Sequence, residues 1–208
     1  TTVIVSTGTF LQGLIHVGEI HYPGVWRDEK PAEGFSESLR KNGIELVRFK
    51  TGTCPRLHAD SIDWSAIEEQ KGDDPPPPFS FRTDKLVVDQ LSCYITHTNL
   101  NSHEIIKRNL HRSPLYAGRI VGTGPRYCPS IEDKVVKFPD KNHHQLYLEP
   151  EGRDTKQVYV NGLPTSLPSD VQEAVVHSIK GLEHAEILLW GYAIEYDYVD
   201  PTELKHTL

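Results

Sequence analysis

Hydrophobic and polar positions along this chain follow two different spacings. Residues 168–180 place their apolar side chains on one helical face, begin with a proline and are followed by Gly181, a pattern that predicts a helix. Short apolar or alternating runs predict strands, at residues 44–49, 94–98, 146–148 and 185–189. Because these strands alternate with helices, we expect an α/β domain.

Local end signals predict further elements. Residues 3–5 form an apolar run that stops near Gly8, which predicts a buried strand that ends where the backbone can approach a ligand closely. Residues 36–43 predict a helix that ends at an Asn-Gly pair. Asn101 and Glu104 have the spacing of a capping box, so a second helix is expected to begin with Asn101 as its cap.

A polar segment around Cys128 is the first candidate for chemistry. Pro125 and Pro129 bracket the cysteine and predict a loop in place of a helix. Arg126 and Lys134 lie nearby in sequence, and cations beside a thiol favour the nucleophilic thiolate. The segment therefore predicts either a reactive thiol or a surface loop with a half-buried cysteine.

Two groups of cations are candidates for anion binding. Lys50-Thr-Gly-Thr53 and Arg56 combine positive charge with small hydroxyl residues at a predicted strand end, which suits a phosphate. The alternative is a strand-terminal turn with solvated cations. Arg126 can bind a phosphate or carboxylate in bidentate fashion, or it can form an ion pair with Glu132 or Asp133.

Composition narrows the function classes. The chain has 208 residues, enough for one large domain or two small ones, and its net charge of −7 argues against a globally basic nucleic-acid binder. No apolar run is long enough for a transmembrane helix. Cys54, Cys93 and Cys128 show no zinc-binding spacing, so we expect free thiols and a reducing compartment. His143 and His144 are adjacent and point to opposite faces of a strand, so no metal site is expected.

Several segments, in order along nearly the whole chain, carry one resemblance. They are residues 7–11, 50–53, 55–56, 79–81, 93–99, 109–114, 124–138, 148–152 and 191–197. The stretch GPRYCPSIEDKVVKF at 124–138 is the most informative of them. Together these segments resemble the MnmG family, also called GidA, which comprises flavoproteins that modify the wobble uridine of certain tRNAs.

The resemblance implies an enzyme that adds a carboxymethylaminomethyl-type group at carbon 5 of the wobble uridine. In such enzymes FAD is reduced by NADH, and a folate supplies the one-carbon unit. The implied partners are tRNA and an MnmE-type GTPase. The full-length form would be a homodimer in the cytoplasm, or in the mitochondrion of a eukaryote. Two alternatives are a folate- and FAD-dependent tRNA methyltransferase of the TrmFO type and a non-catalytic binding module that keeps the fold.

The resemblance also assigns site residues. Cys128 corresponds to a cysteine implicated in the family's chemistry, and Thr7, Gly8 and Ala32 correspond to positions near the flavin. The family's nicotinamide-nucleotide-binding stretch maps onto Gly124, Pro125, Arg126, Tyr127, Cys128, Pro129, Ser130, Ile131, Glu132, Asp133, Lys134, Val135, Val136, Lys137 and Phe138. The cations of this stretch would neutralise the phosphates of NAD.

The implied fold is α/β, as part of a Rossmann-like FAD-binding domain with an inserted mixed α/β domain. Residues 1–50 would form the end segment of the FAD-binding domain, and residues 51–190 would form the inserted nicotinamide-nucleotide-binding domain. Residues 191–208 would return toward the FAD-binding domain. No GxGxxG motif is present, so the chain would be a central fragment without the N-terminal glycine-rich turn and the C-terminal helical domain.

Three places depart from the family pattern. The family has Gly-Gly-Arg-Ala-Gly where this chain has residues 24–28, including Val25 and Trp26. It has Arg-Pro-Gly-Tyr where this chain places Trp190, and it has a proline in place of Cys54. Small residues allow a nucleotide to approach the backbone closely, so the bulky replacements favour weaker flavin binding and with it the non-catalytic alternative.

Overall fold

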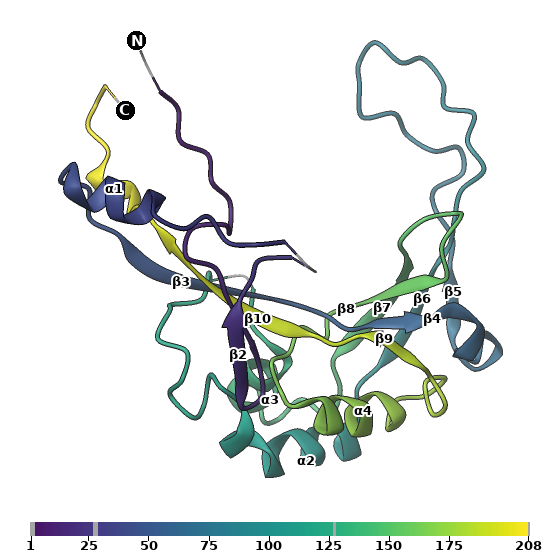
Figure 1. Cartoon of the computed structure of the whole chain (residues 1–208). Coiled ribbons are helices and arrows are strands. Elements are labelled where there is room, and N and C mark those ends of the chain that lie inside the picture. The colour runs from purple at the N-terminus through teal and green to yellow at the C-terminus, as the bar shows by residue number, and fades with distance from the viewer. Residues whose placement is uncertain (1–2, 27–28, 127, 208) are drawn as a thin grey trace.

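The computed structural model describes residues 3–26, 29–126 and 128–207, and its strands form two sheets (Figure 1). The first sheet has the order β2-β1-β10-β3, and its strands are β1 (Leu14–Val17), β2 (Ile20–Pro23), β3 (Val47–Thr53) and β10 (Tyr192–Tyr198). The second sheet has the order β5-β6-β7-β8-β4-β9. Its strands are β4 (Arg56–His58), β5 (Glu68–Gln70), β6 (Cys93–His97), β7 (Gln145–Pro150), β8 (Gln157–Asn161) and β9 (Ile187–Leu189).

Three helices lie together beneath the second sheet, and one lies near the two chain termini (Figure 1). The three are α2 (Leu100–Arg108), α3 (Ile131–Lys137) and α4 (Ser169–His177), and the fourth is α1 (Phe35–Lys41). Short 3-10 turns occur at Ala59–Ser61, Trp64–Ala66, Leu110–Arg112 and Pro201–Glu203. Apolar side chains of the second sheet and the three helices form the main core, which includes Leu57, Ile106, Ile131, Val135, Leu146, Leu148, Val158, Val160, Val171, Val175 and Val176.

Two extended crossings join the sheets. Strand β3 leads through residues 54–55 into β4, and β9 leads through residues 190–191 into β10. Strand β10 pairs with β3 along its whole length. We call the region around these two crossings the joint. Because both sheets contribute side chains there, the joint brings together residues that are far apart in the sequence.

Several elements confirm the sequence-based predictions. Helix α4 falls within the predicted helix, with Pro168 as its cap and the valines of its inner face buried. Helix α1 ends at Asn42, and Gly43 adopts φ 79°, the left-handed conformation that glycine accepts readily at a helix end. Strands β6, β7 and β9 lie where short apolar runs predict them. These signals are local in the chain, which explains their success.

The buried strand predicted at residues 3–5 is wrong. Val3 and Ile4 expose 79% and 88% of their surface, and no strand in the described part of the chain pairs with them. A short apolar run without a neighbouring strand leaves its backbone groups to water. The apolar pattern alone therefore does not produce a strand at this position.

Helix α2 begins earlier than predicted. Asn99, rather than Asn101, is the cap: its side chain accepts a hydrogen bond from the Ser102 backbone N–H at 3.0 Å. The Asn99 N–H donates in return to the Ser102 hydroxyl at 2.7 Å. The serine hydroxyl thus takes the role expected of Glu104, and Asn101 lies inside the helix.

The loop predicted around Cys128 ends earlier than expected, because helix α3 begins at Ile131. Pro125 and Pro129 restrict the backbone only up to the helix start. Ser130 then caps the helix by accepting a hydrogen bond from the Asp133 N–H at 3.2 Å. The carboxylates of the segment therefore belong to a helix and not to a loop.

The mixed α/β class is confirmed, but the ladders are all antiparallel among the named strands. The alternation of strands and helices is more typical of parallel sheets. Here the helices cover the second sheet without connecting parallel neighbours. The Rossmann-like placement of the first sheet stays a prediction. None of the helices in the described ranges is long and apolar enough to cross a membrane.

Candidate active site

A short stretch of chain lies along the outer edge of β3 and brings two sequence motifs together. The Lys50 N–H donates to the Thr123 carbonyl at 2.9 Å. Glu195 on β10 accepts hydrogen bonds from the backbone N–H groups of Val121 and Gly122 at 2.9 and 2.6 Å. These bonds fix the start of the cysteine-containing segment against the Lys-Thr-Gly-Thr motif of β3. The two motifs are distant in sequence and adjacent in the fold.

Cys128 lies at one face of the first sheet. Its Sγ is 3.6 Å from the Oγ1 of Thr51, and the cysteine is half-buried. Thr51 pairs with Ile194 in the ladder, and Thr53 pairs with Tyr192. Because side chains alternate along a strand, these four side chains share one face of the sheet. The thiol therefore belongs to the surface that Thr51, Thr53 and Tyr192 line.

Lys134 lies close to two of the three thiols. Its ammonium donates a hydrogen bond to the Gly162 carbonyl at 2.8 Å. Burial lowers the pKa of Lys134, and the neighbouring Cys54 and Cys128 act in the opposite direction. The ammonium already donates to a backbone carbonyl, which makes it a poor candidate for a phosphate ligand. It remains a positive charge near the two thiols.

The first turns of α3 belong to the core. Ile131, Glu132 and Val135 expose at most 1% of their surface. The Oε1 of Glu132 accepts a hydrogen bond from the Ser166 N–H at 3.2 Å. Burial raises the pKa of Glu132, and the hydrogen bonds to its carboxylate oppose that shift. The side chains of these residues therefore face inward and are not available to a ligand.

Other residues of the predicted nicotinamide stretch are exposed or form ion pairs within α3. Asp133 forms an ion pair with Lys137 at 3.1 Å. Val136 and Phe138 expose 40% and 51% of their surface. Tyr127 lies outside the described residues. A ligand at this stretch would thus meet the backbone and side chains ahead of the helix and the outer face of α3.

The two cations of the Lys50-to-Arg56 region do not converge. Lys50 is 4% exposed and lies on the sheet face opposite Thr51. The Nε of Arg56 donates to Glu151 at 3.1 Å, and its Nη1 donates to the Thr53 hydroxyl at 2.7 Å. The phosphate site predicted from this motif is therefore not formed as a single cluster. The motif also continues β3 and does not follow the strand end.

The predicted flavin contacts lie in two adjacent segments. The Ala32 N–H donates to the Phe10 carbonyl at 2.8 Å, and the Phe10 N–H donates to the Thr7 carbonyl at 3.1 Å. Gly8 adopts φ 52° in the turn between them. A cavity of about 430 Å³ borders these segments and is lined by Thr9, Phe10, Val25, Trp26, Glu29, Thr51, Gly52, Thr53, Tyr192 and Ile194. We call it the threonine cavity, and one of its lining residues, Thr51, contacts Cys128.

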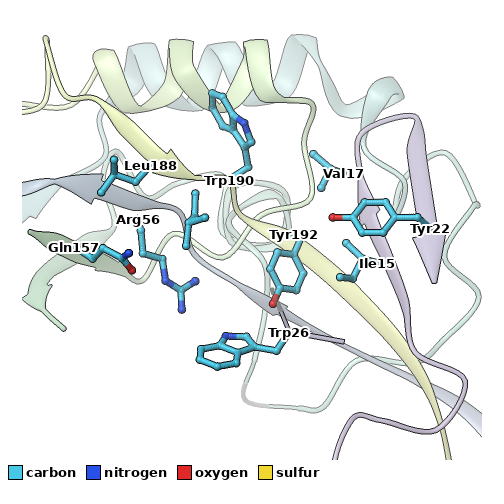
Figure 2. Close-up of a pocket in the computed structure, with 10 residues that line it drawn as sticks. Ile15, Val17, Tyr22, Trp26, Arg56, Gln157, Leu188, Trp190 and Tyr192 are labelled. Carbon is cyan, nitrogen blue, oxygen red and sulfur yellow. The ribbon is translucent and has the colours of Figure 1, made fainter. Parts of the chain in front are cut away.

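A second cavity, of about 360 Å³, lies at the joint of the sheets (Figure 2). Its lining residues are Ile15, Val17, Tyr22, Trp26, Arg56, Gln157, Leu188, Leu189, Trp190 and Tyr192. We call it the aromatic cavity. Trp26 and Trp190 stand at two of the positions where the sequence is interpreted as departing from the pattern of the family it resembles. The sequence signals each departure, but only the fold shows that both tryptophans line one cavity.

The histidine-rich segments do not form a metal site in the described residues. No group of three or more His, Cys, Asp or Glu side chains suited to a metal occurs in the described part of the chain. His143 lies against the ring of His97 at 5.2 Å between centroids, and His144 lies against His103 at 5.2 Å. The adjacent histidines therefore have separate partners, as expected for neighbouring positions on an extended backbone.

The fold and the site define a mixed α/β protein with a thiol beside a cavity of ligand size. The chain belongs to the MnmG (GidA) family, because the family described as "Glucose inhibited division protein A" matches residues 1–208. A similar protein is the tRNA uridine 5-carboxymethylaminomethyl modification enzyme MnmG of Thermodesulfovibrio yellowstonii, which is 59% identical over 206 residues. The enzyme of the same name from Helicobacter hepaticus is 56% identical over 206 residues.

The comparison extends to solved structures. The structure of Aquifex aeolicus GidA in the form I crystal matches with a TM-score of 0.89 and 53% identity, covering 98% of this chain and 35% of that one. The form II crystal gives a TM-score of 0.87 and 50% identity, covering 97% of this chain and 33% of that one. The match to the two bacterial enzymes covers 99% of this chain and 33% of each of them. The chain therefore spans about a third of the length of the relatives it matches.

Proposed function

We propose that this chain is part of an enzyme that installs a carboxymethylaminomethyl group at carbon 5 of the tRNA wobble uridine. The relatives carry the uridine modification in their names, and they match nearly the whole chain. The observation that carries the proposal is the contact between Cys128 and Thr51. It joins the family's most informative motif to the cavity side of the first sheet.

In this proposal Cys128 is the thiol near the reacting flavin or uridine. A thiol acts as a nucleophile in its thiolate form, which nearby positive charge stabilises. Lys134 lies near enough to provide such charge while its ammonium is held by the Gly162 carbonyl. Cys128 is half-buried and contacts Thr51, which lines the threonine cavity, and this contact supports a reacting group in that cavity.

The proposed nicotinamide nucleotide site is narrower than the stretch 124–138. Because Ile131, Glu132 and Val135 are core residues, contacts to NADH would come from residues 124–130 and the exposed side of α3. Arg126 is the proposed phosphate ligand, since a guanidinium binds phosphate in bidentate fashion.

The residues present fit the ring end of a flavin better than its pyrophosphate. The threonine cavity offers aromatic faces and hydroxyl groups, which suit a planar ring with polar edges. The described residues include no glycine-rich turn of the kind that binds a dinucleotide pyrophosphate. When bound, FAD would carry the electrons taken from NADH. We expect the 208-residue chain on its own to bind FAD weakly, and purification with stoichiometric yellow flavin would contradict this.

The rest of the proposal concerns the longer protein. The proposed partners are tRNA, an MnmE-type GTPase and a folate one-carbon donor, with a homodimer as the assembly and the cytoplasm or mitochondrion as the location. The proposed domain division is supported by the sheets, since residues 56–189 supply the strands of the second sheet. The first sheet draws its strands from both flanking parts, as expected for a domain that the second domain interrupts.

A matched pair of cysteine variants tests the function. Cys128→Ser in the protein that contains this chain should lower the initial rate of uridine modification by about a hundredfold or more, the scale on which a group in the chemical step acts. Cys93→Ser, on strand β6, should leave the rate unchanged. The readout is the mass of modified nucleosides released from tRNA, which also separates the carboxymethylaminomethyl product from a methylated one.

The result can also favour the non-catalytic alternative, which the bulky Trp26 and Trp190 support. A protein that binds tRNA but yields no modified uridine in the presence of FAD, NADH, a one-carbon folate, glycine as the source of the carboxymethylamino group, and the GTPase with GTP would overturn the proposed activity. Equal rates for both cysteine variants would remove Cys128 from the chemistry.

A further inference from the structure

Arg56 presents a fixed cation to the aromatic cavity. Its Nε donates to Glu151 at 3.1 Å. Its Nη1 donates to the Thr53 hydroxyl at 2.7 Å and to the Cys54 carbonyl at 2.9 Å. The guanidinium also lies 4.6 Å from the centre of the Tyr159 ring, and the residue is only 8% exposed. Within the described residues Nη2 makes no hydrogen bond, so this donor remains available to a ligand.

Flat aromatic rings form much of the rest of the cavity. Trp26 and Trp190 expose 47% and 37% of their surface despite their size, and Tyr192 lies between them in the view of Figure 2. Gln172 holds the backbone of Gly191, next to Trp190, through two hydrogen bonds of 2.8 Å. The wall that carries Trp190 and Tyr192 is therefore fixed before any ligand binds.

The positive charge of the cavity lies to one side of it. Arg56 and Gln157 lie on that side in Figure 2 together with Leu188, and Ile15, Val17 and Tyr22 lie on the other. The volume of about 360 Å³ is within the range of small-molecule sites, roughly 300–1,000 Å³. A ligand that fills this space would therefore meet aromatic faces, an apolar end and a polar end that carries a positive charge.

We propose that the aromatic cavity binds an unpaired nucleobase, which stacks on the indole rings and directs a hydrogen-bond acceptor toward Nη2 of Arg56. Bases stack on aromatic side chains whatever their sequence, and their carbonyl and ring-nitrogen edges accept hydrogen bonds from arginine. An aliphatic ligand would offer no acceptor to the Nη2 donor of Arg56. A bare phosphate would leave the aromatic faces unused. A nucleobase satisfies both halves of the cavity.

The base can belong to an RNA strand or to a free nucleotide. Only the RNA source rests on the proposed function. Binding is measured without turnover, so failure of this site and failure of the modification activity are distinguishable.

Tryptophan fluorescence provides the test. The chain has three tryptophans, and Trp64 lies in the second sheet region against Tyr94, with 4.4 Å between ring centroids. The Trp64→Phe variant of the 208-residue chain therefore keeps only Trp26 and Trp190, which both line the aromatic cavity. Trp26 also borders the threonine cavity, so the loss of quenching in Trp190→Ala assigns the signal to the aromatic cavity. It is titrated with AMP, with a single-stranded uridine tetranucleotide and with ribose 5-phosphate, and far-UV circular dichroism checks the fold of every variant.

We expect AMP, the tetranucleotide or both to quench this fluorescence, and ribose 5-phosphate to leave it unchanged. Trp190→Ala and Trp26→Ala in this background should each weaken binding about tenfold, equivalent to ~1.4 kcal/mol, while Trp190→Phe should restore most of the affinity. Quenching by the tetranucleotide alone identifies an RNA strand as the source, and quenching by AMP alone identifies a free nucleotide. Absence of quenching by either base, equal quenching by ribose 5-phosphate, or affinity that survives both alanine variants overturns the proposal.

Discussion

Gln172 is the side chain whose replacement tests the packing between α4 and the joint most directly. It is 2% exposed. Its amide nitrogen donates to the carbonyls of Leu167 and Gly191 at 2.7 and 2.8 Å, and its amide oxygen accepts from the Gly191 N–H at 2.8 Å. Gln172→Met keeps the length and helix propensity of the side chain but removes all three hydrogen bonds.

The expected loss follows from the buried groups that remain. A hydrogen bond contributes about 1 kcal/mol net, and a buried group left unpaired costs about 1–3 kcal/mol. Three backbone groups lose their partner, so Gln172→Met should lower the free energy of unfolding by roughly 3 kcal/mol. In urea, with a slope of about 2–3 kcal/mol per molar, the midpoint should fall by about 1 M.

The neighbouring exposed position supplies the control. The side chain of Glu173 is exposed, so Glu173→Met should change the free energy of unfolding by less than about 0.5 kcal/mol. Gln172→Glu keeps an acceptor for Gly191 but directs a carboxylate at two carbonyl oxygens, so it should destabilise at least as much as the methionine. A loss under about 1 kcal/mol for Gln172→Met would refute the reasoning, because it would mean that other groups satisfy the backbone at Gly191.

Three further predictions follow from the site and its surroundings. Cys128 should be alkylated before Cys54 and Cys93, since burial raises the pKa of both other thiols; peptide mass spectrometry measures this, and earlier labelling of Cys93 would count against it. In the longer protein, Arg126→Ala should raise the NADH concentration needed for flavin reduction by roughly ten- to a hundredfold while flavin stays bound, and an unchanged NADH dependence would assign Arg126 to another role. Burial lowers the pKa of His144 to about 4, so the unfolded state takes up its proton first and the free energy of unfolding should fall as pH drops from about 6.5 toward 4. His144→Phe should flatten this part of a urea-midpoint series against pH, and an unaltered curve would assign the dependence elsewhere.

The site could be predicted from the sequence only as separate motifs. The residues around Cys128 and the Lys-Thr-Gly-Thr motif are recognisable by their chemistry, and their resemblance to one family is evident along the chain. Their contact through Thr51 cannot be recognised in the sequence, because the pairing of Thr123 with the edge of β3 joins distant segments. The inward position of Glu132 is equally hidden, since a carboxylate beside prolines is more typical of a surface loop.

The sequence by itself determined the elements whose signals are local. Helix α4 has its apolar spacing and its end signals within one segment, and Gly43 ends α1 through its own backbone freedom. The tertiary structure alone decided which strands pair, which face each side chain occupies and which residues meet at the joint. The alternation of side chains along a strand determines which residues share a face, but it does not determine which strand pairs with it. Trp26 and Trp190 therefore share a cavity only because β1, β4 and β10 come together there, through hydrogen bonds and burial between segments that no local pattern connects.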